Sequence, residues 1–202
     1  MIAVAAAAAE GLAELVGVLD ELGPVLVLGP ERPSDLPAHA AFVTTDLSSA
    51  AGTREAWAAG EAARGPVEAL ITVPSPLPAG PTPTTQVGDE LWSDTLRDNL
   101  TVAMHAVRAA VPAMLDRGHG RIVMATWRLD RAAGMAPFAA VGGAVRLFAR
   151  ALASEVGDRG VTVNAVSALP GRLADMAPAV RLLCSPDAGY LTAEVLSRAV
   201  DT

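Results

Sequence analysis

One segment, residues 135–155, constrains the fold of this chain more than any other. It runs Met-Ala-Pro-Phe-Ala-Ala-Val-Gly-Gly and continues with Ala, Val, Leu, Phe, Arg, Ser and Glu, which predicts a single long helix. The chain is 51% hydrophobic but only 3% aromatic, so its core must be built from Ala, Val and Leu, which suits close helix packing. Gly142 and Gly143 each cost about 1 kcal/mol relative to alanine inside a helix. Such a pair indicates close approach of another backbone.

Three motifs flank this helix in a characteristic order. Arg97-Asp-Asn99-Leu comes first, then residues 120–126 (Gly-Arg-Ile-Val-Met-Ala-Thr), and after the helix Gly-Val-Thr-Val-Asn with Pro170-Gly171 at the end of residues 160–171. This order resembles the C-terminal half of the short-chain dehydrogenase/reductases (SDR). The resemblance implies an α/β fold with a Rossmann-like, doubly wound parallel sheet of about seven strands. It covers nearly the whole chain, so we expect one domain over residues 1–202, truncated by some tens of residues relative to the family.

The elements expected on this basis alternate along the chain. An unbroken apolar run at 24–29 is typical of a buried parallel strand, and the apolar face of 10–22 predicts a helix ending at Gly23. The expected strands are 2–7, 24–29, 41–45, 67–73, 120–126, 161–166 and 190–196, and the expected helices are 10–22, 53–64, 91–115, 137–156 and 175–185.

The catalytic positions of the family are filled by residues without the required chemistry. The resemblance places a Tyr and a Lys four residues apart on one helix face, where Lys lowers the pKa of the proton-donating Tyr. Phe138 and Gly142 stand there. All 15 cationic residues are Arg, and the only tyrosine is Tyr190, near the C-terminus. Thr126-Trp127 occupies the place of the family's Ser. Asn99 is retained and is interpreted as a structural remnant, so we predict no catalytic set.

The cofactor-binding positions also depart from the family. Its glycine-rich turn lets the backbone approach a dinucleotide pyrophosphate; here residues 5–9 are all Ala, only Gly11 resembles a motif glycine, and we expect the loop to be deleted. Asp46 matches an adenine-contacting Asp but is favoured instead as the cap of a helix starting near Ser48 or Ser49. Prolines at 74–83 replace a nicotinamide wall, and a substrate lid after Gly171 is missing. No cofactor is expected to bind this chain, and NAD(P) is expected to bind only to an intact partner.

Several classes of function are disfavoured. A net charge of −7 argues against nucleic acid and anionic membranes, no apolar run is expected to span a bilayer, and the N-terminus lacks the basic region of an export signal. The lone Cys184 favours a packing role and a reducing cytoplasm. No metal-ligand spacing is present. His39 and His119 precede strands, which places them at the edge of the sheet away from ligands.

Three hypotheses for function follow. The first is a non-catalytic SDR-like subunit that assembles with a catalytically intact homologue of ketoreductase type through helices 91–115 and 137–156. Its expected interface comprises Phe138, Ala139, Val141, Gly142, Gly143, Val145, Phe148, Ala149 and Leu152. The second is a repurposed enzyme performing cofactor-independent cyclisation, dehydration or isomerisation with Asp46, Ser75, Asn99, Thr126, Arg128 or Asp130. The third is an atypical NAD(P)-dependent oxidoreductase.

Overall fold

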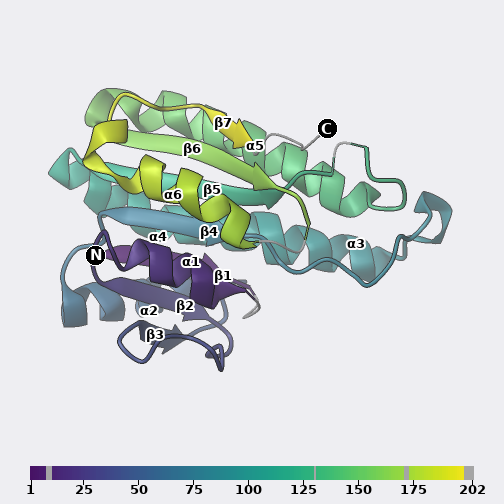
Figure 1. Ribbon diagram of the computed structural model, residues 1–202, viewed down its shortest axis with the longest axis horizontal. Coiled ribbons are helices and arrows are strands. Elements are labelled where there is room, and N and C mark those ends of the chain that lie inside the picture. The colour runs from purple at the N-terminus through teal and green to yellow at the C-terminus, as the bar shows by residue number, and fades with distance from the viewer. Residues whose placement is uncertain (8–10, 130, 171–172, 198–202) are drawn as a thin grey trace.

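The chain folds around one seven-stranded parallel sheet. The computed structural model describes residues 1–7, 11–129, 131–170 and 173–197. The strand order is β3-β2-β1-β4-β5-β6-β7, with every neighbouring pair parallel. The predicted Rossmann-like fold class is confirmed (Figure 1). The strands are β1 (Ile2–Ala6), β2 (Val25–Gly29), β3 (Ala41–Thr44), β4 (Ala69–Val73), β5 (Gly120–Trp127), β6 (Val161–Ala168) and β7 (Val195–Ser197).

Helices cover both faces of this sheet. Residues of α2, α4 and α5 form one hydrophobic cluster with the sheet, and residues of α1 and α6 form the other (Figure 1). Every residue of β1, β2, β4, β5 and β6 is buried, as expected for a parallel sheet enclosed on two sides. The helices are α1 (Leu12–Leu19), α2 (Ala50–Arg64), α3 (Asp89–Leu96), α4 (Val102–Arg117), α5 (Ala136–Val156) and α6 (Ala177–Cys184).

Two segments differ from their local sequence preference, the alanine-rich strand β1 and the last strand. The alanines of β1 favour a helix, yet Ala3 and Ala5 are fully buried between β2 and β4 in a regular ladder. Tertiary packing therefore overrides propensity here. The predicted last strand is wrong in extent: only β7 forms a regular ladder with β6, because the chain turns at Ala193, which has φ 62°. Ala193 N–H still donates to Val163 O, and Glu194 O accepts from Ala165 N–H. Asn164 holds this turn by donating to Leu191 O and accepting from Glu194 N.

Helix boundaries show two further corrections. Asp46 does not cap α2, because Ser49 is the N-cap and its hydroxyl accepts from the Gly52 N–H at 3.2 Å. Gly23 is not the C-cap of α1, which ends three residues earlier at Asp20. Both errors come from reading caps off residue type alone, since neighbouring Ser, Asp and Gly residues compete for the same role.

The predicted helix 91–115 contains an irregular segment. A π-helical stretch, Arg97–Thr101, joins α3 to α4, and such bulges recur at functional sites. α3 continues beyond the carboxyl end of the sheet (Figure 1). The bulge therefore places Asn99 at this end of the molecule, next to the loop that follows β4.

Helix α5 and its following turn, Ala136–Arg159, are long and apolar enough to cross a membrane by length and composition, since an 18-residue window within them has a mean hydropathy of 1.3. The expectation that no apolar segment reaches this length is therefore wrong. Length and composition do not distinguish a membrane span from a core helix, and α5 buries Val141, Val145 and Ala149 in the same cluster as the sheet. Its inner face is therefore part of the core.

Cys184 ends α6 at the opposite edge of the sheet from the cleft described below, beside Arg121 and Pro186. Burial raises the pKa of its thiol to about 12, although the nearby Arg121 cation acts in the other direction. At pH 8 the thiolate fraction is then about a thousandfold below that of a thiol with the ordinary pKa of 9.0. We expect the native chain to react with a disulfide reagent that much more slowly than the urea-unfolded chain. Equal rates in native and unfolded protein would contradict this assignment.

Candidate functional site

A cleft of about 570 Å³ lies at the carboxyl edge of the sheet, where open α/β folds bind ligands. Its walls come from the loops that follow β4, β5 and β6 and from the turn before α1. The described residues that line it are almost all apolar: Gly11, Pro74, Pro76, Leu77, Pro78, Pro81, Trp127, Leu129, Ala132, Ala133, Met135, Pro170 and Leu173.

Phe138 and Gly142 lie in the first turns of α5, next to the end of β5. Phe138 is half-buried and borders a smaller cavity that also contacts Ser75 and Asp94. Gly142 is buried. A Cβ at this position would lie 3.1 Å from Thr126 Oγ1 and 3.2 Å from the Trp127 carbonyl oxygen. The predicted close approach at Gly142 is therefore confirmed, and the space there does not admit a side chain without movement of β5.

Thr126 and Trp127 end β5 and are both buried. The indole Nε1–H of Trp127 donates to Ser75 O at 2.7 Å, which ties the end of β5 to the loop after β4. This hydrogen bond uses the only polar group of the indole, so its ring serves as an apolar wall of the cleft.

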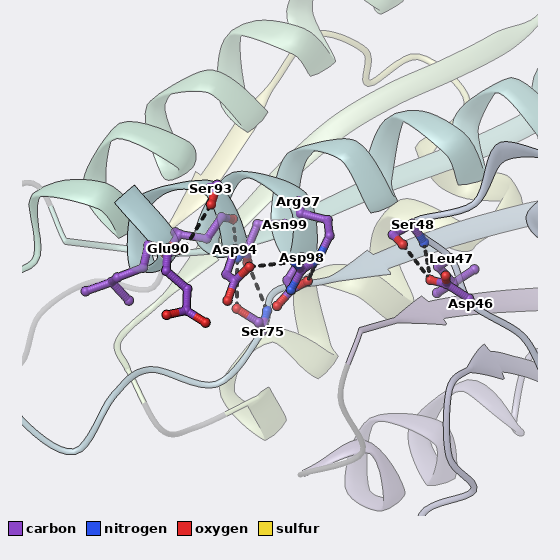
Figure 2. A network of polar contacts seen from close by, with 12 residues as sticks. Asp46, Leu47, Ser48, Ser75, Glu90, Ser93, Asp94, Arg97, Asp98 and Asn99 are labelled. Atoms are coloured by element: carbon purple, nitrogen blue, oxygen red, sulfur yellow. Dashed lines mark hydrogen bonds and ion pairs between the residues drawn. The ribbon is translucent and has the colours of Figure 1, made fainter. Parts of the chain in front are cut away.

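Asn99 holds the same loop from the other side. Its Oδ1 accepts from the Ser75 N–H at 2.9 Å, and its Nδ2 donates to Ser75 Oγ at 2.8 Å and to Thr95 O at 2.9 Å (Figure 2). Both amide N–H groups and the carbonyl oxygen of the side chain are thereby engaged. These contacts support the interpretation of Asn99 as a residue that satisfies backbone and side-chain groups beside a strand.

Asp46 lies apart from this pair, in an Asx turn after β3. Its Oδ1 accepts from Ser48 Oγ at 2.7 Å and from the Ser48 N–H at 2.9 Å, and these bonds lower the pKa of the carboxyl group (Figure 2). His105 points into the core, where Nδ1 contacts Leu47 O at 3.0 Å. His105 therefore does not share a site with Asn99.

A second cavity of about 300 Å³ adjoins Asp46 and Ala7. Arg97 and Asp98 also line it, and the Arg97 guanidinium is shared between Asp94 at 2.5 Å and Asp98 at 2.9 Å (Figure 2). Hydrogen bonding to Asp98, and then to Asp94, raises the pKa of Arg97. The cation is therefore already neutralised, and the carboxylates Asp46 and Asp98 leave this cavity acidic.

The structure brings together only some of the residues proposed from sequence. Ser75 contacts Asn99 and Trp127 directly, and Thr126 lies against Gly142. Arg128 donates its backbone N–H to Ala168 O, and Asp130 is outside the described residues. The apolar lining of the large cleft was missed, because it comes from separate loops that share no motif. Its only signal is the run of prolines in residues 74–81, which the sequence predicted to replace the nicotinamide wall.

In the part of the chain that the structure describes, no three His, Cys, Asp or Glu side chains are grouped closely enough to hold a metal ion. The absence of a metal site stays a prediction. His39 pairs with Asp20, and His119 borders a cavity at the amino edge of the sheet together with Arg121. Both histidines are thus remote from the cleft, as their positions before strands predicted.

The connection from β1 to α1 is longer than expected. It comprises residues 7–11, of which 8–10 lie outside the described part of the chain. The deletion of the family's glycine-rich loop therefore stays a prediction, because it concerns residues outside the described part of the chain. Gly11 has φ 72°, and a Cβ there would lie 3.3 Å from Leu173. After Pro170, the chain reaches a 3-10 turn at Leu173–Met176 and then α6, so little chain is available for a lid; Gly171 itself is not described.

A family model and curated relatives match this chain, and each is named as a dehydrogenase or a reductase. A model described as short chain dehydrogenase matches residues 6–181. The 3-oxoacyl-(acyl-carrier-protein) reductase FabG of Vibrio cholerae is 33% identical over 136 residues, covering 54% of this chain and 56% of the relative. The inactive 2-(S)-hydroxypropyl-CoM dehydrogenase 2 of Xanthobacter autotrophicus is 32% identical over 143 residues, covering 70% and 60%.

A solved structure titled as a 3-oxoacyl-reductase from Bacillus thuringiensis superposes with a TM-score of 0.85 at 20% identity, covering 100% of this chain and 99% of that one. This similarity concerns the fold. The chain spans little more than half the length of the curated relatives that it matches. The family model alone covers well over half of the sequence, and the chain belongs to the short-chain dehydrogenase family.

Proposed function

We propose that this chain is a cytoplasmic, non-catalytic member of its family that assembles with, and supports, a catalytically intact relative of ketoreductase type. One observation carries the proposal. The position of the family's Lys is a buried glycine packed against Thr126 and Trp127, and the position of its Tyr is Phe138. A phenyl ring has no exchangeable proton and glycine has no side chain, so this helix face supplies neither a proton donor nor a neighbouring cation.

The residues at the cofactor positions also fit a dinucleotide poorly. Binding of a diphosphate needs backbone N–H donors and complementary charge. Here Ala7 and two carboxylates, Asp46 and Asp98, line the cavity beside β1, and Arg97, the one cation among its described lining residues, is paired twice. The prolines after β4 offer no N–H groups. We expect calorimetric titration of the isolated chain with NADPH to give no binding; a micromolar dissociation constant would favour the atypical oxidoreductase.

The outer face of α5 supports the assembly part of the proposal, although it shares only Gly143 with the interface predicted from the sequence. Val141, Gly142, Val145, Ala149 and Leu152 are buried within the chain and cannot meet a partner. On the exposed side of α5, small residues surround Leu147, which is 67% exposed, and the exposed Arg150 flanks them. This outer face consists of Ala140, Gly143, Ala144, Leu147 and Ala151. Small residues at helical spacing let a second helix approach closely.

The test is co-expression with intact family members from the same cells, followed by size-exclusion chromatography and a reductase assay. We expect one intact relative to co-elute with this chain and to be more soluble or more active than when expressed alone. Leu147→Glu should abolish co-elution, because it places a charge in the helix interface. The matched control is Leu182→Glu on α6, where the leucine is 47% exposed on the other side of the sheet.

Two results would contradict the proposal. One is a set of intact relatives that are equally soluble and active without this chain. The other is a Leu147→Glu variant that co-elutes as well as Leu182→Glu does, because the outer face of α5 would then play no part in assembly.

A further inference from the structure

The 570 Å³ cleft has a lining suited to one kind of ligand. Small-molecule sites generally have volumes of about 300–1,000 Å³ and mostly apolar walls. Among the described residues around this cleft none is charged, and the larger side chains are Leu77, Trp127, Leu129, Met135 and Leu173. Transfer of a charged group from water into such surroundings is costly without a paired charge.

Hydrogen bonds between the loops fix the walls of the cleft. Thr82 N–H donates to Gly134 O at 2.8 Å, which fastens the proline-rich loop to the loop after β5. Gly134 has φ 74°, and a Cβ there would lie 2.4 Å from Pro81 Cβ, so the two loops touch closely. At the other end, Ser75 is held by Asn99 and Trp127. A wall fixed in this way need not be ordered by the ligand, which favours binding.

Hydrogen-bonding capacity narrows the ligand further. Prolines at 74, 76, 78, 81 and 170 have carbonyl oxygens but no N–H groups. The indole N–H of Trp127 is already donated to Ser75 O. Within the described part of the wall, the prolines and the Trp127 indole therefore supply no free hydrogen-bond donor.

We propose that this cleft binds a neutral, apolar small molecule, and that it does so without a dinucleotide. The ligand class is an uncharged hydrocarbon or aromatic molecule, because the large side chains of the described lining are apolar. This binding goes beyond a role in assembly and does not require it, because the cleft is formed by one chain and lies apart from the outer face of α5.

Fluorescence titration with N-phenyl-1-naphthylamine, an uncharged apolar probe, tests the proposal on the full chain. We expect a saturable rise in probe emission with one site and a micromolar dissociation constant. Addition of NADPH should leave that constant unchanged. Met135→Glu, which places a carboxylate in the wall, should weaken binding at least tenfold, whereas the volume-conserving Met135→Leu should stay within about twofold.

Met135 suits this comparison because it is the N-cap of α5. A carboxylate is favourable at a helix N-terminus, so we expect Met135→Glu to keep the fold, as circular dichroism and thermal unfolding would show. A second variant, Ala133→Trp, fills the cleft from an exposed position and should also weaken binding, whereas Ala58→Trp on the exposed side of α2 should not.

Three outcomes would overturn the proposal: no saturable binding, equal affinity for Met135→Glu and Met135→Leu, or competition by NADPH. These results are separate from the test of assembly. Met135→Glu should still co-elute with an intact relative, and Leu147→Glu should still bind the probe. The proposal of assembly and the proposal of ligand binding can therefore fail independently of each other.

Discussion

Installing both family side chains, as Phe138→Tyr with Gly142→Lys, is expected to give a less stable protein that still has no reductase activity. The loss of stability comes from position 142. A Cβ there meets Thr126 Oγ1 at 3.1 Å and the backbone oxygen of Trp127 at 3.2 Å, so β5 or α5 must shift. Overpacking of this kind costs about 1–3 kcal/mol, and partial burial of the lysine ammonium adds to it.

Gly143 provides a matched control one residue along the same helix. A Cβ at Gly143 meets nothing within 4 Å, so Gly143→Lys should raise the free energy of unfolding by about 0.5–1 kcal/mol through helix propensity alone. Urea denaturation would measure both variants, and oxidation of NADPH with a ketone substrate would measure activity. Hydride transfer by the double variant, or equal stability of the 142 and 143 variants, would contradict the account of this helix face.

The order of elements could be predicted because the sequence signals were strong where burial is complete. The run in β2 is apolar throughout, those in β4, β5 and β6 are mostly apolar, and each became a fully buried strand. Prediction failed where side-chain contacts decide the ends. The last strand is short because Asn164 fixes residues 191–194 as a turn, and no local pattern announces a contact across 27 residues.

Parts of the candidate site could likewise be predicted from the sequence, and other parts could not. Family positions in one helix and one strand could be located by spacing, and Gly142 does lie against Thr126. Val145 and Ala149 of α5 were predicted to face a partner, but they are buried against the sheet, which the alternation of small and large residues along this helix did not reveal. The apolar cleft required four connections to converge. Leu77 and Leu173 are 96 positions apart in sequence, so their meeting depends on topology rather than on a motif.

Replacing Gly160 by alanine should have a large effect on stability from a position remote from the cleft. Gly160 precedes β6 with φ 79°, a left-handed conformation that costs an L-residue about 1–2 kcal/mol. Its added Cβ would lie 2.1 Å from the carbonyl oxygen of Gly118, the residue that ends α4, and backbone cannot move aside as a flexible side chain can. Strain and overpacking together predict a loss of about 2–5 kcal/mol in the free energy of unfolding.

Gly118→Ala separates the two contributions. Gly118 has φ 65°, but a Cβ there meets nothing within 4 Å, so only the conformational cost of about 1–2 kcal/mol should appear. Urea denaturation of both variants measures the difference, which reports the contact between the turns that precede β5 and β6. These strands pair along their whole length, from Gly120 and Val161 to Trp127 and Ala168, so this contact also helps to fix the register that places Trp127 in the cleft. Equal losses for the two variants would show that the turns do not touch, and the position of the β5 end against α5 would then need another cause.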